Sequence, residues 1–455
     1  MVFSLGALAA AVGGFLRWKR AKDEEDEEIM AQAKKIMIFS SLALAVFLII
    51  LGFIFFWKKS PPEVISLPPP PNMEKDIFPY EPIKKDQVTL PPPPSLQLGA
   101  GAIESHYPWR SQTNVPLNSA LVIDFKLPME VNDFMGTANL INTKNVRIKK
   151  ANDPKAQELS KFTVAVSPDK TVFIFKPQVL WAKNTLYSVL LANEIKAASG
   201  AKVFGNDFYT WNFTTGSLED KTSPRILQIQ PEISKALPGN TMLEILFSEP
   251  VLVFPPAVIV KTEGRLASFR FLPAHDFRSL ALTGKEGCGK NLCEEDVFCF
   301  AKEKVFQALL LAKEISDMAL NTLDGNANGV AENSPKDDYR FSFSVGSEIK
   351  TGGPQIVKTV PLKGAGEVSL DSPLEIWFSS VIAKHTLNTK TITLNLRDVN
   401  WWLSAFDMPS GSAGNMATKV FIRHDPFQPF TTYYPQVAKG VKDLYQNCFS
   451  PPQGP

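Results

Sequence analysis

Large apolar residues recur at every second position at three well-separated places in this chain. The apolar positions of the three segments are Leu121, Ile123 and Phe125; Leu243, Ile245 and Phe247; and Leu374, Ile376 and Phe378. A period of two is typical of a β-strand that turns one face toward a core. The segments lie roughly 120 to 130 residues apart, which is the spacing of whole domains and exceeds the period of any solenoid repeat. We therefore expect three copies of one β-domain.

Each copy continues with a second pattern. Apolar segments begin at Leu186, Val305 and Tyr433, and the first two copies close with alternating strands at 211–216 and 339–346. Many short strands between Pro, Gly and Asn turns predict an all-β fold of tandem β-sandwiches. The third copy has no such closing strand. Its sheet would leave an open edge for a strand of another chain, unless the copy is truncated or closes by local rearrangement.

A continuous apolar segment precedes these domains. Residues Ile36 to Trp57 carry no charge and stand between Lys34-Lys35 and Lys58-Lys59. A helix of this length covers about 33 Å and would span the hydrocarbon core of a bilayer. Basic residues are more numerous on its N-terminal side, so we expect a single-pass cell-membrane protein with a cytoplasmic N-terminus and extracellular C-terminal domains. The sequence leaves open whether the shorter apolar segment Val2 to Phe15 also enters the membrane.

Proline dominates the segment that follows. The four-proline runs Pro68–Pro71 and Pro91–Pro94 favour extended polyproline II, which predicts a semi-rigid stalk on the order of 100 Å long. The expected organisation is a cytoplasmic segment (1–35), a transmembrane α-helix (36–57), a proline-rich stalk (58–104) and three β-sandwich domains (105–217, 223–347 and 353–455). The sequence does not say whether the third domain is complete.

The strand ends and turns of the copies resemble the bacterial Ig-like domain family, which occurs in S-layer and other surface proteins. The first copy carries the resemblance at Phe125 to Met129, at Phe175 to Pro177 with Leu180, Thr185 and Tyr187, and at Phe213 to Thr215. The resemblance covers 105–217 well, 223–347 fairly and 354–455 partly. Because core and turn residues define this family, the resemblance implies tandem Ig-like surface modules and nothing catalytic.

Charge and motifs argue against nucleic-acid binding and catalysis. The formal net charge is only +2, so no overall basic field points to a nucleic-acid partner. Neither H-E-x-x-H nor G-x-S-x-G occurs. The four histidines stand far apart in the sequence and are expected to be surface residues: His106, His275, His385 and His424. We therefore expect a protein that is not an enzyme.

Three of the four cysteines fall in one short window, namely Cys288, Cys293 and Cys299, whereas Cys448 lies near the C-terminus. In an exported domain we expect a disulfide among the three. A metal site is the alternative, but the spacing lacks a C-x2-C pair and no histidine lies nearby. The sequence does not determine which pair forms.

A candidate calcium loop lies in the second copy. Its ligands would be Asp324, Asn326 and Asn328, followed by Asp337 or Asp338. The first three occupy positions 1, 3 and 5 of a calcium loop, and Gly329 stands at position 6, where a sharp turn is needed. Pro335 replaces the glutamate of position 12, so one of the later aspartates would have to substitute. The alternative is an Asn/Gly-rich turn, and no other cofactor is expected.

The pair Trp401-Trp402 is a candidate binding feature. Neighbouring residues of a strand point to opposite faces, so both cannot enter one core. An exposed tryptophan could stack on a sugar or dock a protein, whereas packing under a loop is the alternative. The function expected from the whole chain is structural or adhesive: a membrane-anchored protein that presents tandem domains to surface protein or glycan ligands. The alternative is a subunit of an envelope-spanning secretion or pilus-like assembly.

Overall fold

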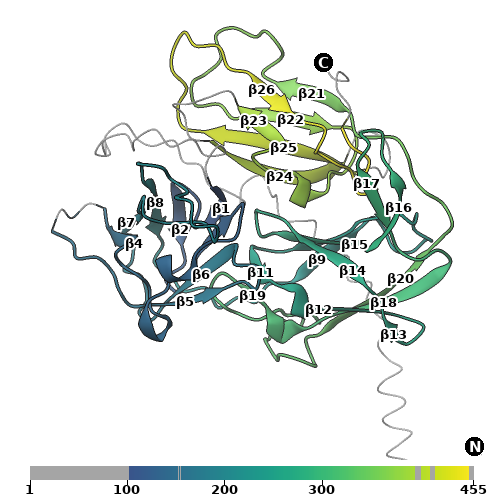
Figure 1. Ribbon diagram of the computed structural model, residues 1–455, viewed down its shortest axis with the longest axis horizontal. Coiled ribbons are helices and arrows are strands. Elements are labelled where there is room, and N and C mark those ends of the chain that lie inside the picture. Colours follow the sequence, from purple (N-terminus) through teal and green to yellow (C-terminus); the bar gives the residue numbers. More distant parts are fainter. Residues whose placement is uncertain (1–101, 152, 154, 395–400, 410–415, 450–455) are drawn as a thin grey trace, which may run out of the picture. The chain divides into compact units, whose positions relative to one another are not determined.

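The computed structural model describes residues 102–151, 153, 155–394, 401–409 and 416–449 (Figure 1). All of them belong to residues 82–455, the second of two compact units into which the chain divides. The predicted transmembrane helix and nearly all of the predicted stalk lie outside the described residues. Within the described part, no helix is both long enough and apolar enough to cross a membrane.

The first domain is built from two four-stranded sheets. One sheet has the order β1 (Ile103–Tyr107), β3 (Leu121–Phe125), β6 (Val172–Pro177), β5 (Phe162–Val166), and the other has the order β2 (Gln112–Val115), β8 (Tyr209–Thr215), β7 (Leu186–Leu191), β4 (Val146–Lys150). Two short 3-10 helices, η1 (Val131–Asp133) and η2 (Thr137–Asn139), connect β3 to β4. Neighbouring strands pair antiparallel, except for the parallel pair of β2 and β8.

Strand β8 illustrates how the sequence pattern builds this core. Its burial alternates residue by residue, so that Tyr209, Trp211 and Phe213 face inward. The ring of Phe213 packs on Tyr187 and on Trp181. The hydroxyl of Tyr187 accepts a hydrogen bond from the backbone N–H of Ala182 at 2.9 Å. A strand tyrosine bonded back to the upstream backbone is a feature of Ig-like sandwiches.

The second domain repeats this plan and adds two small sheets. Its larger sheets have the orders β14 (Phe269–Pro273), β15 (Ser279–Gly284), β10 (Leu243–Phe247), β9 (Ile226–Gln230) and β13 (Arg265–Leu266), β12 (Val258–Thr262), β18 (Lys304–Leu310), β20 (Tyr339–Val345). The additions are the pair β11 (Val251–Val253) with β19 (Ile315–Asp317) and the hairpin β16 (Glu286–Lys290) with β17 (Asp296–Cys299). The 3-10 helices η3 (Pro255–Ala257) and η4 (Ala312–Glu314) precede β12 and β19.

The third domain has one complete sheet and one reduced sheet. The complete sheet has the order β21 (Ile356–Val360), β22 (Leu374–Phe378), β25 (Met416–His424), β24 (Trp401–Pro409), and the reduced sheet pairs β23 (Ile392–Leu394) with β26 (Pro435–Val437). The 3-10 helix η5 (Lys384–Thr386) lies between β22 and β23. In the described residues, no strand takes the place next to β26 that β8 holds next to β7 and β20 holds next to β18.

Within the described residues, the prediction of tandem all-β sandwiches is confirmed. The three alternating segments form β3, β10 and β22, each an inner strand of a four-stranded sheet. The two predicted closing strands are β8 and β20. Each domain encloses its own apolar core of buried residues.

Each of the three domains also contacts the other two. A small apolar cluster joins Tyr107 and Val122 of the first domain to Met318 of the second. A second cluster joins Met242 of the second domain to Leu444 of the third. Between the first and third domains, the carboxylate of Glu104 accepts hydrogen bonds from the N–H and hydroxyl of Thr389, at 3.0 and 3.2 Å.

Candidate functional site

A buried ion cluster lies between the second and third domains. The ammonium of Lys384, in η5, lies 2.8 Å from Oδ1 of Asp407 in β24 and 3.3 Å from Oε2 of Glu244 in β10. None of the three side chains is more than 6% exposed. One positive charge therefore faces two negative charges in a nearly dry interface, where an unpaired carboxylate would be costly.

Hydrogen bonds satisfy the remaining oxygens of this cluster. Oε1 of Glu244 accepts from the backbone N–H of Lys384 at 2.8 Å and from the hydroxyl of Ser279 at 3.1 Å. The Asp407 carboxylate accepts from Thr418 and Gln230. Burial raises the pKa of Glu244, and the negative charge of Asp407 adds to this rise against the opposing charge of Lys384. Burial alone would lower the pKa of Lys384, but Asp407 and Glu244 outweigh burial and raise it.

Two disulfides lie close to this interface. Cys288 is bonded to Cys299 within the β16–β17 hairpin, and Cys293 is bonded to Cys448 across 155 residues of sequence. The first bond lies within the window in which the sequence predicts a disulfide. The second joins the second domain covalently to the third. The hairpin is also held by the third domain at Gln446, whose side-chain amide bonds the backbone of Phe298 through both its oxygen and its nitrogen.

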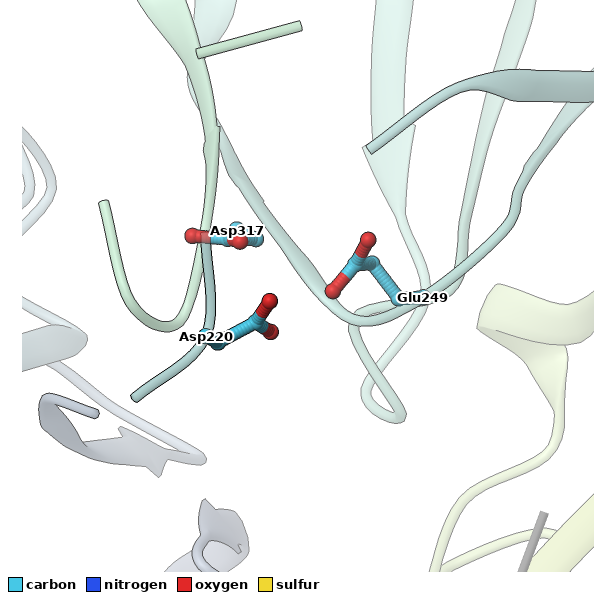
Figure 2. A group of neighbouring side chains, drawn as sticks. All are labelled: Asp220, Glu249 and Asp317. Carbon is cyan, nitrogen blue, oxygen red and sulfur yellow. The ribbon is translucent and has the colours of Figure 1, made fainter. Parts of the chain in front are cut away.

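Three carboxylates face one another where the first and second domains meet (Figure 2). Asp220 follows β8, Glu249 lies in the turn from β10 to β11, and Asp317 ends β19. One oxygen from each lies within 4.8 Å of the other two. Among the described residues, this is the one place where at least three acidic, histidine or cysteine side chains gather so closely.

Protonation and hydrogen bonding explain how these three carboxylates can lie so close together. Burial, followed by the charges of Asp317 and Asp220, raises the pKa of Glu249 to about 8. Burial also raises the pKa of Asp317 to about 6, although hydrogen bonds from Asn321 oppose the rise. Asp317 accepts from both the N–H and the amide of Asn321, four residues on, as Asp443 does from Asn447 in the third domain. The repeated Asp–Asn pair indicates a turn-stabilising role for Asp317.

The predicted tryptophan pair lines a pocket formed by all three domains. This cavity of about 80 Å³ lies between Glu104 to Arg110, His275-Asp276 and two segments of the third domain. Trp401 belongs to the core of the third domain, whereas Trp402 is only partly buried. Two of the lining residues, Ser105 and Arg110, each carry a buried polar atom without a hydrogen-bond partner, the Ser105 hydroxyl and Nε of Arg110. The lining thus combines aromatic side chains with residues whose polar groups are not fully satisfied.

The predicted calcium residues all lie in the connection between β19 and β20, but not all of them face one point. Asp324 begins the loop, and its buried carboxylate is paired with Arg225, at 3.2 Å. Asp338 faces elsewhere, because its Oδ1 accepts from the backbone N–H of Ala312 and from the hydroxyl of Ser334. The loop therefore retains Asp324, Asn326, Asn328 and Asp337 as candidate ligands.

The expectation of surface histidines is wrong for His106 and His424, which are 4% and 8% exposed. Both ring nitrogens of His106 have partners, the carbonyl oxygen of Pro108 and the hydroxyl of Tyr209. His275 links the second domain to the first, because its Nδ1 lies 2.8 Å from Oδ2 of Asp124. Burial alone would lower the pKa of His275, but the bond to Asp124 outweighs it and raises the pKa. His106 and His275 therefore have structural roles that their isolated positions in the sequence did not suggest.

These observations define a protein of tandem β-sandwiches fastened to one another by ion pairs and one disulfide. The sequence profile of the bacterial Ig-like domain matches residues 100–215 and 350–453, and these two regions are bacterial Ig-like domains. The middle domain repeats the strand order of the first, since β9, β10, β15 and β14 correspond to β1, β3, β6 and β5. No curated protein matches the sequence.

Solved structures with similar chains include bacterial surface proteins. The N-terminal part of the bacterial S-layer protein SbsC is 9% identical over 75% of this chain and 59% of its own length, with a TM-score of 0.20. The S-layer protein rSbsC(31-844) is 9% identical over 98% of this chain and 67% of its own length, with a TM-score of 0.23. A titin fragment, A168169, is 12% identical over 54% of this chain and 97% of its own length, with a TM-score of 0.16. The family assignment rests on the profile matches and the observed sheets.

Proposed function

We propose that this chain is a structural or adhesive protein of the bacterial cell surface, in which the Ig-like domains act as one fastened body. The observation that carries the proposal is the double connection between the second and third domains. The buried Lys384 cluster fixes their orientation, and the Cys293–Cys448 bond prevents their separation. Domains joined only by a flexible linker would swing independently.

The disulfides and the N-terminal sequence support a location outside the cytoplasm. Disulfides persist in exported proteins and are rare in reducing cytosol, and all four cysteines of the chain are paired. In this proposal, residues 36–57 anchor the chain in the lipid bilayer and the proline-rich segment holds the domains away from it. The three-domain pocket with Trp402 would face surface protein or glycan ligands, for which its aromatic surface is suited.

Labelling of intact cells tests this location. Cells that express the full chain would be treated with a membrane-impermeant amine reagent, and labelled lysines would be identified by mass spectrometry. We expect labelling of the exposed Lys149 and Lys261 and none of Lys34 or Lys35 until the cells are broken. Protection of Lys149 and Lys261 in intact cells would contradict the proposed surface location.

A subunit role in an envelope-spanning assembly is a second candidate, and the reduced sheet of the third domain favours it. Among the described residues, β26 pairs only with β23, so one edge of β26 has no neighbouring strand. An unpaired edge can accept a strand from a partner. Purification of the full chain after cross-linking of intact cells separates the two candidates: a partner in fixed stoichiometry supports the assembly, and a free chain supports the adhesive role.

A further inference from the structure

The connection between β19 and β20 is organised around the buried Asp324. The two oxygens of its carboxylate accept the backbone N–H groups of Asn328, at 3.1 Å, and Gly329, at 2.8 Å. The side-chain oxygens of Asn326 and Asn328 accept the N–H groups of Asn328 and Val330, at 2.9 and 2.8 Å. Alternate side chains of the loop therefore each hold an oxygen against the backbone N–H groups of residues 328–330.

Asp337 approaches the same loop from its far end and has an unsatisfied oxygen. The residue is fully buried, and its Oδ2 accepts the N–H of Glu332. Its Oδ1 is buried with no hydrogen-bond partner. The backbone of Asp337 also packs against the start of the loop, because a side chain at Gly325 would clash with its carbonyl oxygen. A buried carboxylate oxygen without a donor is unusual, since burying a charge is costly unless it is paired.

The cation that pairs with Asp324 is Arg225, which reaches into solvent. Its guanidinium lies 3.2 Å from the carboxylate, and its side chain is 45% exposed, whereas the side chain of Asp324 is fully buried. A buried carboxylate is costly to leave unpaired, so Arg225 can move into water only when another cation takes its place. The carboxylate of Glu332, 27% exposed, also lies beside the loop and accepts from the amide of Asn328 at 2.9 Å. Carboxylate and amide oxygens in an irregular loop suit Ca²⁺, which tolerates irregular geometry, better than Mg²⁺.

We propose that this loop binds one Ca²⁺ ion through oxygens of Asp324, Asn326, Asn328 and Asp337, with Arg225 released to solvent. The unsatisfied Oδ1 of Asp337 takes the place of the bidentate ligand that Pro335 cannot supply. The site also touches the connection between the first two domains, because the N–H of Asp324 donates to the carbonyl oxygen of Pro224 at 2.9 Å. Calcium would therefore stiffen this connection, an effect separate from the Lys384 cluster.

Calorimetric titration of the purified full chain with calcium chloride, after removal of bound metal with chelator, tests the site. We expect one binding event in the wild-type chain. In Asp337→Asn and in Asn326→Ala, the affinity for calcium should be at least about tenfold weaker than in the wild type. Because Asn326 is exposed, its replacement leaves the fold intact and keeps the test valid if Asp337→Asn does not fold. Two matched controls, Asp338→Asn and Asp317→Asn, should bind calcium as the wild type does.

Three results would overturn the proposal. The first is an absence of calcium binding in the wild-type chain. The second is unchanged affinity in Asn326→Ala together with unchanged affinity in a folded Asp337→Asn chain. The third is a loss confined to Asp317→Asn, which would place the ion in the acidic group of Asp220, Glu249 and Asp317. Surface labelling of intact cells does not depend on any of these outcomes.

Discussion

Glu244 and Lys384 belong to different domains, yet their charged groups lie 3.3 Å apart and neither side chain is more than 6% exposed. Glu244 stands on the outer face of β10, a face that is commonly solvated in an antiparallel sandwich. Asp124 occupies the outer face of the corresponding strand β3 and meets His275 of the second domain at 2.8 Å. In both domains, an acidic residue on the outward side of an inner strand meets a basic side chain of the following domain.

Replacement of Lys384 by methionine should destabilise the protein strongly. The change leaves the carboxylates of Glu244 and Asp407 buried without a cation, and removal of one partner from a buried ion pair costs about 3 to 5 kcal/mol. Denaturant-induced unfolding of the full chain measures the loss. Lys313→Met is the matched control, because Lys313 is 59% exposed and its replacement should change stability by less than about 0.5 kcal/mol. Equal effects of the two variants would contradict this prediction.

The acidic group of Figure 2 should make stability depend on pH. The pKa of Glu249 is raised from its ordinary value of 4.5 to about 8 in the folded chain. A group with a raised folded pKa stabilises the fold fully below its ordinary pKa, and this contribution is lost as pH rises through the folded pKa. Melting temperatures of the wild type should therefore fall between about pH 4.5 and about pH 8. Glu249→Gln should flatten this fall, and an unchanged pH profile in that variant would show that Glu249 is not responsible.

The pattern of the sequence was sufficient to predict the strands and their inner faces. Period-two alternation in Leu121–Phe125, Leu243–Phe247 and Leu374–Phe378 depends only on neighbouring residues, and all three segments form inner strands. The acidic residue within each segment was visible too. Its significance was missed because an outward charged residue normally indicates a solvated face. Only the docking of another domain makes such a residue informative.

The candidate sites depend on contacts that the sequence does not encode locally. Lys384 and Glu244 are 140 residues apart, and Cys293 and Cys448 are 155 apart. The three acidic residues of Figure 2 come from a linker, a turn and a strand end. By contrast, the ligands proposed for calcium lie within one short loop, so their spacing could be recognised. The unsatisfied oxygen of Asp337 could not be recognised from the sequence, because hydrogen-bond satisfaction is a property of the folded chain.

The two disulfides should differ in their contribution to stability. Loop-closure entropy predicts about 5 kcal/mol for a bond that closes 155 residues, such as Cys293–Cys448, and about 3 kcal/mol for one that closes 11, such as Cys288–Cys299. Each pair would be replaced by alanines, and guanidinium unfolding would be measured without reductant. The loss should be larger for Cys293→Ala with Cys448→Ala. A larger loss for the hairpin pair would show that the bond between the domains constrains little in the unfolded chain.

The adjacent tryptophans should separate into one structural and one surface residue. Trp401 is 3% exposed and packs in the core of the third domain, so Trp401→Ala should cost about 3 to 5 kcal/mol of folding free energy. Trp402 lies on the opposite side of β24 and is partly exposed at the pocket, so Trp402→Ala should cost only about 1 kcal/mol. Thermal unfolding of both variants distinguishes them. If Trp402→Ala unfolded as readily as Trp401→Ala, the pocket face of Trp402 would be an integral part of the folded core and not a surface open to ligands.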